Sequence, residues 1–157
     1  MDVAVKCSDK NHAVGSYKNL FICNWRNETT QKADDGVEAE LDRLLGSSTS
    51  KVYLIFVIDN SAAPPPTNIR KHVGTYVRRI APKVASGIYI HLGEGMSGII
   101  TRSVFAMVQT LSGKPFPMEV HSSIDSGARW INKFVPFISQ REITAAINSV
   151  RDAPDDV

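Results

Sequence analysis

The sequence has few cysteines and no long apolar run, and both shortages restrict the kind of protein it encodes. Only two cysteines occur among 157 residues, Cys7 and Cys23, which is too few for a disulfide framework. We expect both thiols to be reduced and mostly buried. No apolar run approaches the ~20 residues of a membrane-spanning helix. The first residues, Met-Asp-Val-Ala-Val-Lys, lack the basic start and apolar stretch of a signal peptide. These absences predict a cytoplasmic protein with no membrane partner.

An excess of charge of one sign is also missing. Lys and Arg number 18 against 16 Asp and Glu, so the formal net charge is only +2. Nucleic-acid binding usually requires a clustered basic face. Arg78, Arg79 and Lys83 lie close together, but they fall where the last turn of a predicted helix attracts cations through its dipole. We therefore predict no nucleic-acid partner.

The residues that are present describe one ordinary globular domain. Hydrophobic residues make up 43% of the chain and charged residues 22%, which are typical values. The length suits one core, and neither an internal repeat nor a linker-like segment divides it. The prediction is a single domain over residues 1–157.

Short strands alternate with amphipathic helices along this chain. Residues 12–26 predict a β-hairpin, with a possible edge strand in residues 1–8. The apolar run Val52–Ile58 is typical of a strand buried on both faces. Further strands are expected at residues 87–92 and 118–121.

Five helices are expected between and after these strands. Thr29 or Thr30, Thr67, and Ser122 or Ser123 are candidate N-caps for three of them, and the third helix follows a glycine-rich turn and ends at Gly113. The last helix, over about 139–151, begins with the capping-box pattern of Ser139 and Glu142. The order β-β-α-β-α-β-α-β-α-α predicts an α/β fold: an N-terminal hairpin leading into a mixed, mostly parallel sheet of four to five strands.

One family has this order of elements and loops. A strand ending Ile-His-Leu-Gly93-Glu-Gly95 precedes a helix with Arg102-Ser-Val104, and then come Gly113-Lys-Pro-Phe-Pro117, a Glu-Val-His strand and the helix that contains Trp130. In this, the chain resembles the STAS-like (SpoIIAA-like) domains, which are related to bacterial anti-sigma-factor antagonists. The resemblance covers a core of residues 12–134. It implies a non-catalytic regulatory or protein-interaction module without a cofactor, whose partner is another protein or a second copy of the chain.

A first candidate site follows from that resemblance. Regulatory members of the family are phosphorylated on a serine of an Asp-Ser-Ser-Gly type motif before the second helix. The equivalent stretch here runs from Asp59 through Ser61 to Thr67, and it lacks the second serine and the glycine. Asp59, Ser61 and Thr67 are therefore candidates for phosphorylation or ligand binding. The alternative is that the first two turn the chain and Thr67 caps a helix.

A second candidate site is the loop after the fourth predicted strand. Gly93, Glu94, Gly95 and Gly98 match G-x-G-x-x-G between a strand and a helix, where a dinucleotide phosphate can bind. Glu94, however, would repel a phosphate, and glycines also serve tight turns. His91 precedes the loop and is a further candidate residue of this ligand site. The alternative function is thus a small-ligand domain, for a nucleotide, another anion or an apolar molecule, at the carboxyl ends of the strands.

Catalytic and metal-binding patterns are weaker still. His91 and His121 could meet as an acid–base or metal pair if their strands are neighbours, but no metal-ligand spacing supports this. Ser61 and Ser103 lack a nucleophile elbow. We predict no catalytic residue and no metal. The apolar segment 134–138 is expected either to join a partner or to pack onto its own sheet, and both remain open.

Overall fold

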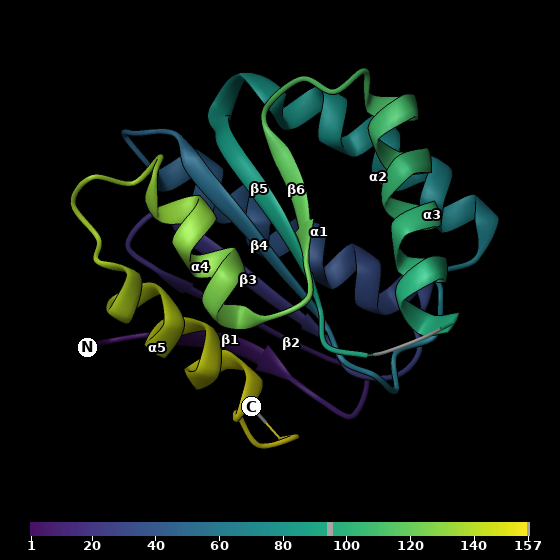
Figure 1. Cartoon of the computed structure of the whole chain (residues 1–157), viewed down its shortest axis with the longest axis horizontal. Helices are drawn as coiled ribbons and strands as arrows, with labels where there is room; N and C mark the ends of the chain where they lie inside the picture. Colours follow the sequence, from purple (N-terminus) through teal and green to yellow (C-terminus); the bar gives the residue numbers. More distant parts are fainter. Residues whose placement is uncertain (94–95, 157) are drawn as a thin grey trace.

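Six strands form one mixed sheet in the computed structural model, which describes residues 1–93 and 96–156 (Figure 1). They are β1 (Ala4–Ser8), β2 (His12–Tyr17), β3 (Leu20–Trp25), β4 (Val52–Ile58), β5 (Val84–His91) and β6 (Met118–His121). Their order in the sheet is their order in the chain. The first three are antiparallel to one another, and β3 to β6 run parallel.

The α/β class and the mixed sheet were predicted correctly, but the expected four to five strands are too few. The additional strand is β1, which pairs with β2 along one edge of the sheet. It is difficult to recognise from the sequence because it is short, carries Lys6 and Ser8, and contains an irregularity between Val5 and Cys7. Edge strands often carry charge in this way.

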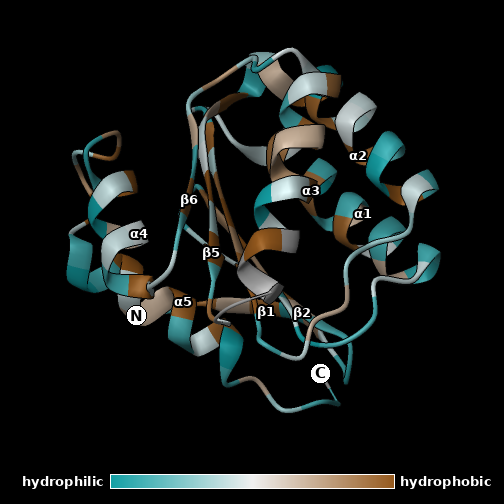
Figure 2. Cartoon of the chain, turned by 45° about the vertical axis from the view of Figure 1, so that its right-hand side comes forward, coloured by the Kyte–Doolittle hydropathy of each residue, from teal (hydrophilic) through white to brown (hydrophobic). Residues whose placement is uncertain are grey.

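Helices cover both faces of the sheet in unequal numbers. α1 (Gln31–Ser47), α2 (Thr67–Ile80) and α3 (Met96–Ser112) lie on one face, and α4 (Ile124–Asn132) and α5 (Gln140–Arg151) lie on the other (Figures 1 and 2). A short 3₁₀ turn, Ala81–Lys83, follows α2. Each of α1, α2 and α3 connects two adjacent parallel strands. Because such crossovers are right-handed and the strands advance in one direction, all three helices fall on the same side.

The helix caps agree with the sequence except at α2. Thr30 and Ser123 accept hydrogen bonds from the backbone amides of Ala33 and Ser126, both at 3.1 Å. Ser139 and Glu142 form the predicted capping box. Thr67, in contrast, does not cap: it is the first residue of α2, and the cap position falls on Pro66, which offers no side-chain hydrogen bond. The rigid prolines that precede it set where this helix can begin.

Two apolar clusters fill the layers. Under α4 and α5 lies a cluster of residues that includes Ile22, Ile88, Ile131, Ile143 and Ile147, all of them 0% exposed. Under α1, α2 and α3 lies a second cluster, which includes Phe21, Val37, Leu41, Leu54 and Val77. Among the described residues, no helix has the length and apolar character needed to span a bilayer.

The segment that links α4 to α5 packs onto the first of these clusters. Val135 and Ile138 are buried, and the side-chain amide of Asn132 donates hydrogen bonds to both of their carbonyl groups, at 3.3 and 2.6 Å. Pro136 and Phe137 are exposed, and Phe137 is 57% exposed. Of the two alternatives for residues 134–138, the structure favours packing onto the domain.

One guanidinium fastens the C-terminal segment to the first hairpin. Arg26, just after β3, donates hydrogen bonds to the hydroxyl of Ser8 at 3.0 Å and to the carbonyl oxygen of Ala153 at 2.8 Å. It also forms an ion pair with Asp155 at 3.0 Å. The C-terminal segment is thereby joined to the end of β1.

Candidate functional site

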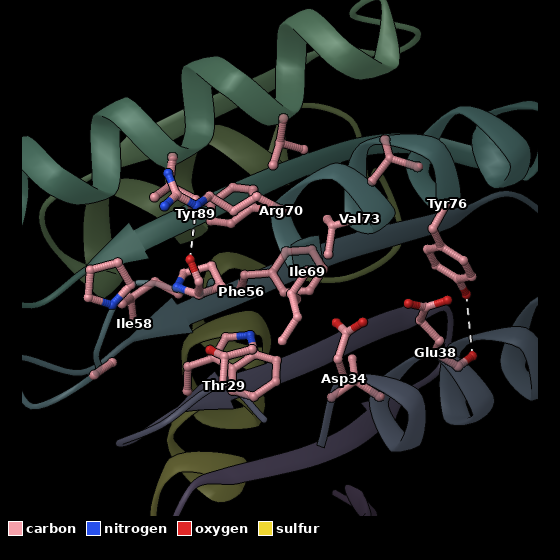
Figure 3. Close-up of a pocket in the computed structure, with 18 of the residues that line it drawn as sticks. Thr29, Asp34, Glu38, Phe56, Ile58, Ile69, Arg70, Val73, Tyr76 and Tyr89 are labelled. Atoms are coloured by element: carbon pink, nitrogen blue, oxygen red, sulfur yellow. Dashed lines mark hydrogen bonds between the residues drawn. The ribbon is translucent and has the colours of Figure 1, made fainter. Parts of the chain in front are cut away.

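A pocket of about 160 Å³ opens between the sheet and the three helices α1, α2 and α3. Its floor consists of residues near the carboxyl ends of β3, β4 and β5, where open α/β sheets commonly bind ligands. Its walls are mostly apolar (Figure 3). The principal lining residues are Trp25, Leu54, Phe56, Ile58, Ile69, Val73, Tyr89 and Val104.

The register of the parallel strands places the aromatic floor. Cys23, Phe56 and Tyr89 are partners across β3, β4 and β5 and therefore share one face of the sheet. The rings of Phe56 and Tyr89 stack with their centroids 5.0 Å apart. Trp25 and Ile58 form the next row on that face. The position of the pocket floor is thus fixed by the backbone hydrogen bonding of the sheet.

Helix α1 brings two acids to the wall of this apolar pocket. Its inward stripe consists of Ala33, Asp34, Val37, Leu41 and Leu45, so Asp34 occupies a position that helical spacing reserves for a core residue. Asp34 is only 4% exposed. Glu38, four residues later, lies beside it, and both carboxylates point away from α1 toward the side chains of α2 (Figure 3).

Three side chains of α2 face the acidic row of α1. The imidazole Nε2 of His72 lies 2.7 Å from Oε2 of Glu38. One turn later, the hydroxyl of Tyr76 donates a hydrogen bond of 2.9 Å to Asp42. Arg79 lies 3.5 Å from the same carboxylate. We refer to this set, Asp34, Glu38 and Asp42 facing His72, Tyr76 and Arg79, as the helix ladder.

Burial dominates the electrostatics of the acids in the pocket wall. It raises the pKa of Glu38 well above the ordinary value, and the adjacent carboxylate of Asp34 raises the pKa further. Burial also raises the pKa of Asp34. Two carboxylates that share a low-dielectric wall retain a proton between them more easily than in water.

The first predicted site is not assembled as one unit. Asp59 follows β4 and lies toward α5, where its Oδ1 accepts a hydrogen bond from Asn24 at 3.0 Å and faces Arg151 at 3.7 Å. The hydroxyl of Ser61 donates to the carbonyl oxygen of Arg26. Thr67 is exposed at the start of α2. Asp59 and Ser61 therefore connect the turn after β4 to the end of β3, and phosphorylation or ligand binding at these residues stays a prediction.

The second predicted site is only partly within the described residues. His91 ends β5 and is 5% exposed, and Gly98 lies in the first turn of α3, whereas Glu94 and Gly95 lie outside the described residues. A Cβ atom at Gly93 would come within 2.4 Å of the side-chain oxygen of Asn60 and 2.6 Å of the His91 ring. A larger residue would force Asn60 or His91 to shift, so close packing favours glycine at this position.

His91 and His121 do not form a pair. Ile90, and not His91, is the partner of His121 across β5 and β6, so the two imidazoles project from opposite faces of the sheet. His121 instead lies 3.0 Å from Glu119 and accepts or donates a hydrogen bond at Ser126. Side-chain alternation along β5 explains why the expected approach fails.

A thiol–imidazole–carboxylate line that the sequence did not reveal lies in the first hairpin. The sulfur of Cys7 is 3.4 Å from Nε2 of His12, and Nδ1 of His12 is 3.1 Å from Oδ1 of Asp9. Burial and the charge of Asp9 raise the pKa of the Cys7 thiol, which disfavours the nucleophilic thiolate. Asp9 also accepts the backbone amides of Asn11 and His12, so it stabilises the β1–β2 turn.

No protein-family model, curated protein or solved structure matches this chain. What is established is an α/β protein with a six-stranded mixed sheet and a pocket at the carboxyl ends of its parallel strands. Finer statements about activity rest on the residues of the pocket.

Proposed function

We propose that this chain is a binding domain that takes up a small, largely apolar molecule in the pocket between the sheet and α1, α2 and α3. The observation that carries the proposal is the pocket itself, whose floor and walls are predominantly aliphatic and aromatic. A dry apolar cavity of about this volume holds a molecule the size of benzene. The ligand class is therefore a single aromatic ring or a short aliphatic chain.

The polar groups at the rim of the pocket restrict this ligand further. Arg70 and Thr29 both line the pocket, and Nε of Arg70 is already engaged by the carbonyl oxygen of Pro65 at 2.9 Å. Ligand sites generally combine apolar walls with a few such oriented polar groups. These two side chains can form hydrogen bonds with a hydroxyl or carbonyl substituent on the ring.

The resemblance to STAS-like domains supplies a second candidate, a regulatory module that acts through protein contact. Its support is the sequence order of strands and helices. The two candidates are compatible, because ligand occupancy of a pocket roofed by three helices can alter the surface that those helices present. They differ in what an isolated chain does: only the binding domain responds to an apolar molecule alone.

Trp25 allows a direct test. The chain has two tryptophans, and Trp130 belongs to α4 on the other face, so Trp130→Phe leaves a single reporter at the pocket. Titration with toluene, phenol, indole and cyclohexanol is expected to change Trp25 fluorescence saturably and to raise the unfolding temperature. A probe at about 100 times its Kd raises the unfolding temperature of a chain of this size by about 5–10 °C.

A matched pair of variants at Val73 tests the location. Val73 lines the pocket from α2 and is half-buried. Val73→Phe is expected to fill the space and abolish the response, whereas Val73→Ala is expected to retain it. The proposal fails if no probe binds the parent protein, or if Val73→Phe binds as well as the parent.

A further inference from the structure

The end of the helix ladder nearest the start of α1 brings three metal-ligating side chains together. Asp34 and Glu38 lie four residues apart on one face of α1, and His72 faces them from α2. One carboxylate oxygen from each acid and one ring nitrogen of His72 all lie within 4.8 Å of one another. Zn²⁺ is held by nitrogen and oxygen ligands at ~2.0–2.2 Å, so these three atoms would have to move closer together to share one ion. We propose that Asp34, Glu38 and His72 bind a divalent transition-metal ion, with Zn²⁺ the best match.

A second observation points to a cation independently of this spacing. Asp34 is 96% buried, since only 4% of its surface is exposed, and among the described residues its Oδ2 has no hydrogen-bond partner. Buried polar atoms are almost always paired, and a buried unpaired charge is costly. Oδ2 belongs to the same carboxylate that faces Glu38 and His72. A bound cation would give this oxygen the partner that the protein does not provide.

Side-chain contacts alone explain the end of the helix ladder at Asp42, whereas the end at Asp34 and Glu38 needs a shared proton or a cation. Asp42 has Tyr76 at 2.9 Å and Arg79 at 3.5 Å, which is an ordinary contact between two helices. Glu38 has His72 at 2.7 Å. Asp34 adds a further negative group next to Glu38, and two carboxylates at one site repel each other unless a proton or a cation lies between them.

The donor set selects the kind of ion. One imidazole nitrogen with two carboxylates fits Zn²⁺ or a similar first-row divalent ion, whereas Ca²⁺ and Mg²⁺ prefer oxygen ligands alone. Three protein ligands leave a fourth position of a tetrahedron free. Asp34 and Glu38 both line the pocket, so that position can face the pocket, and the side chain of His72, 49% exposed, gives the ion a path from solvent.

Metal titration of the full chain tests this directly. Bound metal is first removed from the protein with a chelator. Zn²⁺ alone is then added, and the heat of binding and the unfolding temperature are measured. The expected result is one ion per chain and a rise of about 5–10 °C at about 100 times the Kd. Co²⁺ is expected to bind at the same stoichiometry and to give the visible absorption of a four-coordinate ion. Absence of saturable binding by both ions would overturn the proposal.

Variants of the helix ladder identify the site. His72→Gln, at a half-exposed position that tolerates change, and Asp34→Asn are each expected to weaken Zn²⁺ binding at least ~10-fold. Asp42→Asn removes a carboxylate of the same ladder that is not a proposed ligand, and it is expected to leave the Kd unchanged. Equal binding by His72→Gln and the parent would place the ion elsewhere and refute the assignment.

The metal site and the proposed apolar-ligand function can fail separately. His72 does not line the pocket, so His72→Gln is expected to lose Zn²⁺ while toluene or phenol still changes Trp25 fluorescence. Val73→Phe is expected to do the reverse. If His72→Gln lost both Zn²⁺ binding and the fluorescence response of Trp25, the assignment of His72 as a ligand outside the pocket would be contradicted.

Discussion

The two faces of the sheet are built differently. Under α4 and α5, the packed face consists of side chains such as Ile131, Ile143 and Ile147, each 0% exposed. The face under α1, α2 and α3, which we call the pocket face, contains an open cavity, a buried acid and a helix whose Ile99 is 63% exposed. The difference shows that one face supplies cohesion while the other retains open space with two acids in its wall. Sites that bind ligands commonly occupy the less tightly packed part of a domain.

The contact between α1 and α2 gives a physical reason for this difference. On the packed face, apolar side chains of α4 and α5 interlock with β2, β3 and β5. On the pocket face, the meeting surface of α1 and α2 includes the polar helix ladder. Polar side chains therefore bridge α1 and α2 at that level, and residues of both helices also line the pocket.

Truncation of one isoleucine on each face should give the largest contrast. Ile143→Ala leaves a cavity in the packed face and is expected to lower the free energy of unfolding by about 2–5 kcal/mol. Ile69→Ala is the same change at the pocket wall, where Ile69 is 3% exposed. Its loss is expected at or below the lower end of that range, because one side of Ile69 already borders empty space. Urea unfolding with an unchanged m-value measures both. Equal losses would show that the two faces are equally tight.

Acidification should weaken the packed face selectively. The backbone amide of Ser139 and the hydroxyl of Tyr17 donate hydrogen bonds to Glu142, and these contacts lower the pKa of Glu142 from 4.5 to about 2. The stabilisation is therefore complete above about pH 4.5 and is lost as the pH falls toward 2. Glu142→Gln is expected to flatten this part of the profile of unfolding temperature against pH. Ser139→Ala, which removes the cap itself, is expected to cost about 1 kcal/mol at neutral pH.

A pH profile of Glu142→Gln that is identical to that of the parent between pH 5 and pH 2 would assign the acid sensitivity to other groups. Lys32→Gln is a suitable control, because Lys32 is exposed on α1 and distant in the fold from the Tyr17–Glu142 contact.

Thiol labelling should show whether the pocket face opens locally while the rest of the protein stays folded. This test leaves the stability of the protein unchanged. Cys23 is 0% exposed beneath α1, and burial raises its pKa well above the ordinary value, whereas Cys7 is half-buried on β1. Iodoacetamide is expected to modify Cys7 first, and Cys23 only at the rate of global unfolding. Mass spectrometry after proteolysis distinguishes the two. Labelling of Cys23 faster than unfolding would reveal local opening of the pocket face.

Local patterns were sufficient for most of the fold. The apolar run Val52–Ile58 and the caps at Ser123 and Ser139 were correct because strand burial and capping depend on neighbouring residues. β1 was uncertain because an edge strand needs little apolar character. The cap at Thr67 failed because the preceding prolines decided where α2 begins.

The candidate site was mostly beyond the reach of the sequence. Several acids occur early in α1, and a helix dipole explains such residues without any site. The available signal was the position of Asp34, which shares the inward stripe with Val37 and Leu41. No local pattern could indicate His72, because its relation to Glu38 depends on how α2 crosses the sheet and returns beside α1. The glycine motif that begins at Gly93, in contrast, attracted attention through its spacing, and at Gly93 itself the side chains of Asn60 and His91 leave little room for a Cβ atom.

The C-terminal segment that Arg26 holds has a consequence for folding during synthesis, because the helix before it covers the packed face. The apolar side chains of β2 and β3 on the packed face are covered by α5, which begins only at Gln140. At ~5–20 residues per second, β2 and β3 wait on the order of ten seconds for that cover. The pocket face can assemble from successive neighbours as they appear. The packed face, although the more cohesive of the two, is completed last, so a nascent chain presents it to chaperones throughout most of its synthesis.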